Sequence, residues 1–285
     1  MPGIAPNSDS ALFDRRAWRL HRERAAGLEV NFLHLEVVER LLDRLDLINR
    51  EFPAVLDLGA RDGLLTRRLA GQSGRAWSVA AEPSRRLAAP VPAPRVCADP
   101  ELIPFRDASF DLVASCLVLH WCSDLPGALI QLRRALKPDG LLLAAILGGN
   151  TLVELRTALF EAELAEEGGV SPRVSPTTEL SDAAALLQRA GFAMPVADSE
   201  TITVTYPDML ALMRDLRGMG ETNSLAARHR FLSRATLARA GAIYAERFGD
   251  AEGRIPATFE ILFLTGWAPH PDHAKPRRGQ RRRIG

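Results

Sequence analysis

Cysteine is scarce in this sequence. Its 285 residues include three cysteines, Cys97, Cys116 and Cys122, and no two of them form a C-x-x-C pair. An odd number of cysteines cannot form a closed set of disulfide bonds, which favours a reducing compartment. The six histidines also lack the spacing of metal ligands, so we predict that the protein holds no structural metal.

The chain also lacks long hydrophobic runs. No stretch reaches the roughly eighteen uninterrupted apolar residues that indicate a membrane-spanning helix. The first residues, MPGIAPNSDSALFDRR, do not show the basic and then apolar pattern of a signal peptide. We therefore expect a cytoplasmic protein whose contact with membranes is at most peripheral.

The sequence also has few tyrosines and almost no net charge. There are two tyrosines, and the formal net charge is +1. Residues 271–285 hold six basic side chains and one acid, which leaves a net charge of −4 on the rest of the chain. A mildly acidic body with few aromatic stacking surfaces argues against a nucleic-acid enzyme. Because the basic segment has few apolar residues to bury, we expect it to be disordered.

A glycine-rich turn follows a strongly apolar segment in the first quarter of the chain. The run AVLDLGARDGLLTRRLA, residues 54–70, predicts a buried strand, a tight turn and then a helix. Such a turn lets a nucleotide-like ligand approach backbone N–H groups at a helix N-terminus. We predict an S-adenosylmethionine site in which the turn contributes Asp57, Gly59, Ala60, Arg61 and Gly63.

Two acidic residues follow the next predicted strands. Glu82 ends the apolar segment AWSVAAEPS, where α/β nucleotide-binding folds place a carboxylate on the ribose hydroxyls. Asp99, in VCADPELIPF, is suitably placed to accept a hydrogen bond from the adenine amino group. The apolar run from Phe110 to Leu119 predicts a central strand buried on both faces. Leu117, near the end of this run, is expected to line the cofactor site.

Strands and helices alternate through the first half of the sequence. Leucines recur every three or four residues from Leu125 to Leu136, which predicts a helix that stops at KPDG, residues 137–140, before a strand LLLAAIL. This alternation predicts an α/β fold with a doubly wound sheet and ligands at the carboxyl ends of its strands. The ordered motifs resemble the class I methyltransferases. That resemblance implies a Rossmann-like, seven-stranded sheet, mostly parallel, with the last strand antiparallel.

The second half predicts a helical insertion between two late strands. Residues 151–154, TLVE, have a capping-box pattern that starts a helix expected to pack on the sheet. Further helices are predicted around 183–190, from Pro207 onward and near 236–248, and strands over 201–206 and 259–267. An insertion in this place would roof the cleft and select the substrate.

These observations divide the chain into an N-terminal arm, a core, a cap and a tail. The predicted parts are a helical arm over 1–40, a methyltransferase-like α/β domain over 41–206 and 250–268, a helical cap insertion over 207–249, and a basic disordered tail over 269–285.

A narrower resemblance rests on GGNTLVELRTALFEAELAEEGGVSPRVSP, TITVTYPDM, MRDLRGMGETN and GRIPATFEILFLTGW. From about Phe13 to Lys275, the chain resembles the mitochondrial respiratory complex I assembly factors that have a methyltransferase fold, together with their bacterial relatives. The resemblance implies an enzyme that hydroxylates an arginine in the iron–sulfur subunit of complex I, whereas the fold alone suggests methyl transfer from S-adenosylmethionine. The implied partner is therefore a protein and not a nucleic acid.

Residues for the chemistry itself are predicted in three places. His120, directly after the fourth predicted strand, is the candidate general base. Glu221 and Asn223, in the turn after Gly220, are candidate substrate contacts, as is Tyr206 at the end of a predicted strand. Either turn residue can instead organise the turn.

Two alternatives stay open at this point. The malonyl-acyl-carrier-protein O-methyltransferase of biotin synthesis also resembles the chain in its F-D arm, its cofactor turn and its helical insertion. In addition, Arg61 stands where the D-x-G-x-G-x-G turn of methyltransferases has its middle glycine. That substitution allows a non-catalytic assembly chaperone with a vestigial pocket. Nothing in the sequence indicates the oligomeric state.

Overall fold

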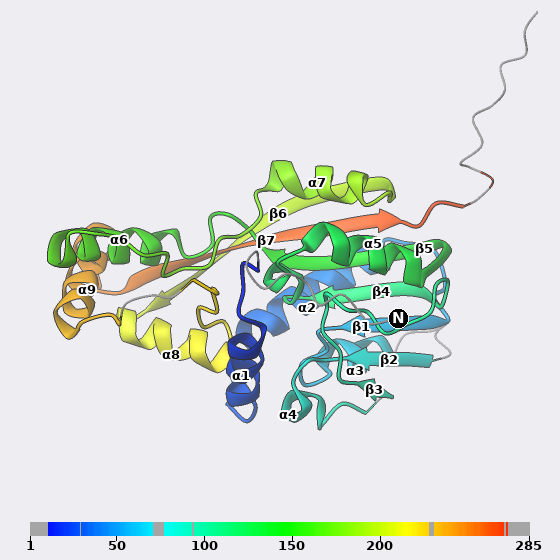
Figure 1. Cartoon of the computed structure of the whole chain (residues 1–285), viewed down its shortest axis with the longest axis horizontal. Coiled ribbons are helices and arrows are strands. Elements are labelled where there is room, and N and C mark those ends of the chain that lie inside the picture. The colour runs from blue at the N-terminus through cyan, green and yellow to red at the C-terminus, as the bar shows by residue number, and fades with distance from the viewer. Residues whose placement is uncertain are drawn as a thin grey trace, which may run out of the picture.

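The computed structural model describes residues 11–28, 30–70, 77–92, 94–227, 231–270 and 272. In this part of the chain a seven-stranded sheet has the order β3-β2-β1-β4-β5-β7-β6 (Figure 1). The strands are β1 (Ala54–Leu58), β2 (Trp77–Ala81), β3 (Arg95–Val96), β4 (Phe110–Cys116), β5 (Leu136–Leu147), β6 (Ala193–Tyr206) and β7 (Ile255–Trp267). β7 runs antiparallel to both β5 and β6, and the other neighbouring pairs are parallel. The predicted class I methyltransferase fold is confirmed.

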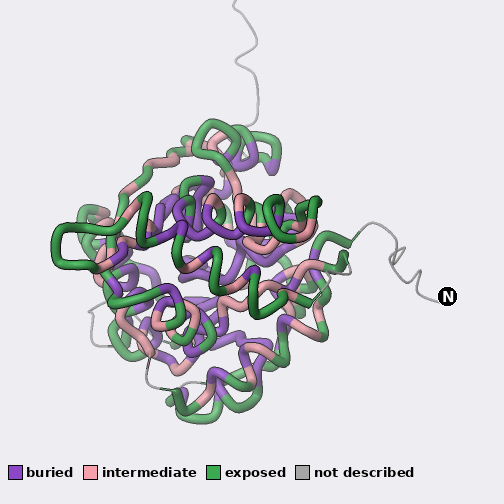
Figure 2. Tube along the Cα trace, turned by 90° about the vertical axis from the view of Figure 1, so that its left-hand side faces the viewer, coloured by how far each residue is buried: buried purple, intermediate pink, exposed green. Residues whose placement is uncertain are grey.

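Helices cover both faces of the sheet. They are α1 (Arg15–Ala25), α2 (Phe32–Asp46), α3 (Leu64–Ala70), α4 (Arg85–Ala88), α5 (Leu125–Ala135), α6 (Val153–Glu167), α7 (Leu180–Arg189), α8 (Met209–Met219), α9 (Arg234–Phe248) and the short 3₁₀ helix η1 (Leu119–Trp121). In β1, Val55 packs with α2, and the next residue, Leu56, packs with α5 on the other face. Successive side chains of a strand point to opposite faces, so an apolar run is needed where both faces are covered. Buried positions accordingly gather at the centre of the molecule (Figure 2).

The strand after α5 begins earlier than predicted. α5 ends at Ala135 and β5 starts at Leu136, so the KPDG segment lies inside the strand and does not precede it. The register shifts here, because Phe110 pairs with Leu136 but Leu112 pairs with Leu141. The extra residues form a bulge in which Asp139 has φ +59°. The proline and glycine of the KPDG segment do not by themselves distinguish a bulge from a turn.

Two predicted helix starts are wrong, for different reasons. Thr151 does not cap α6, because its hydroxyl donates to the Glu260 carbonyl at 3.1 Å, while the carboxylate of Glu154 accepts from the Thr258 N–H at 3.2 Å. α8 begins two residues after Pro207, because the side chain of Asp208 caps the Ala211 N–H at 2.7 Å. The partner of Thr151 is distant in the sequence, whereas α8 starts from an ordinary N-cap residue, Asp208, that follows Pro207.

β6 and β7 extend beyond the rest of the sheet. β5 pairs with β7 only as far as Ile261, whereas β6 and β7 continue to pair as far as Tyr206 and Ile255. Residues 201–206 and 255–260 therefore form a two-stranded ribbon. α6, α8 and α9 pack around this ribbon as a lobe at one end of the molecule (Figure 1). α1 stands between the lobe and the carboxyl ends of the parallel strands.

The helices predicted around 183–190 and near 236–248 correspond to α7 and α9, and the strands predicted over 201–206 and 259–267 correspond to β6 and β7. All four elements begin earlier than the patterns indicated. Within the described residues, no helix combines the length and the apolar character needed to cross a bilayer. Most of the predicted basic tail, including its six basic side chains, lies outside the described residues.

Candidate functional site

The turn after β1 requires glycine at its first position. Gly59 has φ +78°, and a Cβ atom built there would lie 2.5 Å from the side chain of Val118. Gly63 has φ +82° and faces Val91, which would lie 3.1 Å from an added Cβ. Glycine adopts such backbone angles without steric cost. Arg61, between them, also has a left-handed backbone with φ +52°.

The backbone N–H groups of this turn already have partners within the chain. Those of Gly59 and Ala60 donate to the carbonyl of Ala81 at 2.7 and 3.2 Å, and that of Gly63 donates to Ala60 at 2.7 Å. The Arg61 N–H donates to a carboxylate oxygen of Glu82 at 3.0 Å. In this arrangement the turn closes onto the end of β2, and the contact of these amides with a ligand stays a prediction.

Asp57, on β1, is a buried carboxylate with one open acceptor. Its Oδ2 accepts from the hydroxyl of Thr66 at 2.6 Å, whereas Oδ1 has no hydrogen-bond partner among the described residues. Burial raises the pKa of Asp57 to about 7, partly offset by the Thr66 hydrogen bonds. A ligand that enters here can donate a hydrogen bond to this unpartnered oxygen.

Glu82 follows β2 as predicted, but its carboxylate is fully engaged. Nε and Nη2 of Arg22 donate to Oε1 and Oε2 at 2.9 and 2.7 Å. The Ser84 N–H donates to Oε1 and the Arg61 N–H to Oε2, both at 3.0 Å. Both side chains of this ion pair are buried, with 2% exposure for Arg22 and 0% for Glu82. A carboxylate has about four lone-pair sites, and the chain itself fills all of them.

Asp99 is held in a similar way. It lies three residues after β3, and Nε of Arg15 donates to its Oδ2 at 3.0 Å, while Nη2 pairs with the other oxygen. Nη1 of Arg15 donates to the Trp121 carbonyl at 2.6 Å. Sequence reasoning gave no role to Arg15 or Arg22. The signal that could have identified them is their spacing of seven residues, which puts both guanidinium groups on one face of α1.

The Arg61 side chain points toward the lobe. Its guanidinium donates to the carbonyl of Met219 at 2.6 Å and to those of Gly218 and Val30 at 3.3 Å. Burial, and then the neighbouring charge of Arg22, lower the pKa of Arg61. Carbonyl oxygens at the C-terminus of a helix favour a cation, so Arg61 fastens the turn after β1 to the end of α8.

Little space remains between these residues. A small pocket of about 20 Å³ lies among them, enough for about one water molecule. Pockets for drug-sized ligands measure roughly 300–1,000 Å³, so an adenosyl cofactor does not fit the present arrangement. The residues that line the small pocket are Arg22, Leu33, His34, Gly59, Arg61, Cys116, Leu117, Leu147, Met219 and Glu221.

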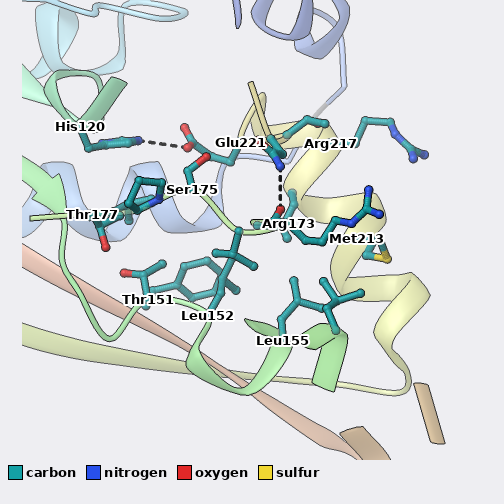
Figure 3. A pocket seen from close by; sticks show the side chains of 18 of the residues that line it. His120, Thr151, Leu152, Leu155, Arg173, Ser175, Thr177, Met213, Arg217 and Glu221 are labelled. Carbon is teal, nitrogen blue, oxygen red and sulfur yellow. Dashed lines mark hydrogen bonds and ion pairs between the residues drawn. The ribbon is translucent and has the colours of Figure 1, made fainter. Parts of the chain in front are cut away.

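A much larger cavity adjoins the small pocket. It measures about 300 Å³ and shares Leu147 and Glu221 with the small pocket. Figure 3 shows its walls, which come from the start of α6, the segment 173–177, α8 and the turn after α8. More than half of the lining residues are apolar: Trp121, Leu147, Leu152, Leu155, Leu159, Val174, Pro176, Met213, Leu216, Leu232 and Phe259.

A cluster of polar side chains lies where the two spaces meet. Nε2 of His120 lies 3.1 Å from Oε2 of Glu221, and Nε1 of Trp121 donates to the same oxygen at 3.0 Å. Oε1 of Glu221 has no hydrogen bond to the described residues, and Nδ1 of His120 is buried without a partner. The structure thus brings together two predicted site residues, His120 and Glu221.

The other two predicted substrate contacts, Asn223 and Tyr206, lie in different surroundings. Asn223 lines the large cavity, but its amide donates to the carbonyls of Pro172 and Arg173 at 3.1 and 3.0 Å and so also organises the turn. Tyr206 is buried at the end of β6 and does not line the large cavity. Among the described residues, no group of three or more His, Cys, Asp and Glu side chains is arranged to hold a metal ion.

Comparisons with known proteins identify the family. A family profile described as a methyltransferase domain matches residues 56–144. The arginine-hydroxylase NDUFAF5, mitochondrial, of Danio rerio is 42% identical over 273 residues, which cover 93% of this chain and 85% of that protein. The malonyl-[acyl-carrier protein] O-methyltransferase of Halorhodospira halophila is 38% identical over 270 residues, covering 91% and 90%.

Solved structures support the fold. The YcgJ protein of Bacillus subtilis has a TM-score of 0.56 at 16% identity, and the match covers 81% of this chain and 99% of that one. This level of identity carries information on the fold alone. The sequence relatives and the methyltransferase-domain match show that the chain is an enzyme of methyltransferase type that belongs to the family of the arginine-hydroxylase NDUFAF5.

Proposed function

We propose that this protein modifies an arginine side chain of a protein substrate, which enters the large cavity with its guanidinium group toward Glu221. One observation carries the proposal: a carboxylate lies in the wall of an otherwise largely apolar cavity, beside the turn after β1. The relatives named arginine-hydroxylases are consistent with it.

The cavity has the character that an arginine side chain needs. Arginine has an apolar stem that packs on hydrophobic walls and a charged head that requires a hydrogen-bonding partner. Leu152, Leu155 and Met213 would contact the stem. The head would donate to Oε1 of Glu221, since Oε2 already accepts from two side chains. Hydrogen bonds of this charge-assisted kind are the stronger ones in proteins.

Glu221 is the one acidic residue among the described residues that line the large cavity, and it can attract a cationic substrate. Arg22 is paired with Glu82, and Arg61 is bound by carbonyl oxygens. His120 can then orient the Glu221 carboxylate through Nε2 while its buried Nδ1 remains available to a substrate atom. In this role His120 and Glu221 bind and position the substrate.

The finer parts of the proposal rest on resemblance. We propose hydroxylation as the reaction, in which dioxygen supplies one oxygen atom to the arginine while a two-electron donor and two protons reduce the other oxygen atom to water. We propose S-adenosylmethionine as the cofactor, the iron–sulfur subunit of respiratory complex I as the partner and the cytoplasm as the compartment. The methyltransferase-type family supports the cofactor. The three free cysteines are compatible with the compartment.

A second candidate function is methylation of a carboxyl group on an acyl chain. The apolar walls of the large cavity suit such a chain, and Arg173 and Arg217 line the same cavity with cationic groups. Arg173 is already paired with Glu163, which leaves Arg217 as the candidate contact. Relatives named malonyl-[acyl-carrier protein] O-methyltransferase support this alternative at 34–38% identity.

The test compares cells that lack this protein with cells that produce the wild type, Glu221→Gln or the surface variant Asp107→Asn. Mass spectrometry of the iron–sulfur subunit should find one arginine heavier by one oxygen with the wild type and with Asp107→Asn. Loss of a charge-assisted hydrogen bond costs about 1.5–3 kcal/mol, so Glu221→Gln should lower the modified fraction about tenfold or more at early times.

Three other results would redirect the assignment. One added methyl group on the arginine would support methyl transfer to the same residue. A methyl ester on a malonyl-carrying acyl carrier protein would support the second candidate. Identical masses in cells with and without this protein would contradict both functions.

A further inference from the structure

One helix holds two of the three carboxylates that the sequence assigns to an adenosyl ligand. Arg22 pairs with Glu82, and Arg15 pairs with Asp99. The two arginines are seven residues apart in α1, so both extend from the same face, about two turns apart. α1 therefore occupies the places where the sequence predicts the ribose and the adenine.

Glu82 has no acceptor to spare while Arg22 is bound. A ribose would need two of its lone pairs for its two hydroxyl groups. The donors from Arg61 and Ser84 are backbone groups of the turn after β1 and of the loop that leads into α4. The two donors of Arg22 are the ones that can leave without unfolding the sheet edge. A ribose and Arg22 thus compete for the same oxygen atoms.

The rest of α1 is seated firmly in the same place. Trp18 is fully buried, and its ring lies 4.1 Å from the guanidinium carbon of Arg15 and 6.5 Å from the ring of Trp121. A carboxylate oxygen of Glu23 accepts from the Arg85 N–H at the start of α4. With about 20 Å³ left in the small pocket, a ligand cannot enter beside a stationary α1.

The start of α1 is also attached to a wall of the large cavity. The Asp14 N–H donates to the Ser224 carbonyl at 2.8 Å, and the Ala226 N–H donates to the Leu12 carbonyl at 2.9 Å. The preceding residues, Thr222 and Asn223, line the cavity. A movement of α1 would therefore act on both spaces.

We propose that α1 is an internal occupant of the cofactor site, whose Arg22 must release Glu82 before an adenosyl ligand binds. The inference rests on the proposed cofactor class and adds its regulation. Release of α1 opens the small pocket and at the same time frees the 222–226 segment beside the large cavity. Cofactor binding and remodelling of the substrate cavity are thereby coupled through one helix.

The test measures the affinity of the whole chain for S-adenosylhomocysteine by isothermal titration calorimetry. When the competent state is only a fraction of the population, the apparent affinity is reduced by that fraction. Arg22→Gln removes the internal competitor and should tighten binding about tenfold or more. Arg19→Gln, an exposed position on the same helix, is the matched control and should bind like the wild type.

If Arg22→Gln misfolds, a second variant and a measurement on the wild type still test the inference. Trp18→Ala loosens α1 without changing Glu82 and should also tighten binding, by a smaller factor. In the wild type, saturating S-adenosylhomocysteine should speed amide hydrogen exchange over residues 15–25 as α1 is released.

Weaker or unchanged binding by folded Arg22→Gln would overturn the inference, because Arg22 would then help to hold the ligand or not compete with it. Slower exchange of α1 in the presence of ligand would overturn it as well. If Arg22→Gln binds more tightly but no arginine becomes modified in cells, this inference stands and the proposed arginine modification fails.

Discussion

Two neighbouring spaces in this protein are built in opposite ways. The small pocket and the large cavity share Leu147 and Glu221, yet they measure about 20 and 300 Å³. Charged side chains of the chain itself fill the first, whereas the second is lined mostly by apolar side chains and stays open. Charged residues of the small pocket therefore contribute to folding, whereas residues of the large cavity leave space for a ligand.

The largest expected effect comes from breaking the buried ion pair of the small pocket. Glu82→Gln leaves the guanidinium of Arg22 without a counterion in a position that is 2% exposed. Removing one partner of a buried pair typically costs about 3–5 kcal/mol. Urea unfolding should show a loss of this size in the free energy of unfolding.

The matched control for this variant is Asp107→Asn. Asp107 pairs with Arg134 at 3.1 Å, but both side chains are more than half exposed. Exposed pairs of this kind contribute about 0–1 kcal/mol. Equal losses for the two variants would contradict the contrast between a desolvated pair and a solvated one.

An intermediate effect is expected for Asp57, whose contribution to the free energy of unfolding should depend on pH. Burial raises its pKa from 3.8 to about 7. A carboxyl group whose pKa rises on folding stabilises the folded state in its protonated form, so this contribution is complete below pH 3.8 and is lost as the pH rises to 7. Asp57→Asn has no carboxyl group to titrate at this position. As the pH rises toward 7, its free energy of unfolding should therefore increase relative to that of the wild type, by at most about 1.4 kcal/mol per pH unit.

Urea unfolding of both proteins at several pH values from about 4 to about 8 measures this difference. The gain should stop above pH 7, where Asp57 is ionised in both states. A difference that does not change with pH would mean that the carboxyl keeps its ordinary pKa in the folded protein.

The smallest expected effect compares one substitution in the two spaces. Leu33 lines the small pocket and Leu155 lines the large cavity. Overpacking a filled core typically costs about 1–3 kcal/mol, so Leu33→Phe should destabilise the protein by that amount. Leu155→Phe can extend into open space and should cost less than about 1 kcal/mol. Thermal or urea unfolding of both variants tests the comparison, and a reversed order would contradict it.

The core of the fold could be predicted from the sequence because its signals are local. The apolar run before Gly59 and the glycine at φ +78° determine a strand followed by a tight turn. Strands also precede Glu82 and Asp99, although β3 ends three residues before Asp99 and not at it. The order of these motifs along the chain was sufficient for the class I sheet.

The partners of those residues could not be predicted in the same way. Nothing near Glu82 in the sequence indicates that Arg22, sixty residues earlier, fills its acceptors. Long-range contacts of this kind also account for the failed capping box at Thr151, whose hydroxyl donates to β7. The large cavity is formed by segments from α6, the 173–177 loop and α8, which meet only after folding.

The two-stranded ribbon of residues 201–206 and 255–260 has a consequence for how this family can diversify. The ribbon carries α8 and α9 as an excursion between paired strands, and its register is fixed by pairs such as Val204 with Ala257. Insertions or deletions within that excursion leave the hydrogen bonds of the central strands untouched. Under the proposed function, changes in this excursion can therefore alter which acceptor molecule binds, while the central sheet keeps its structure.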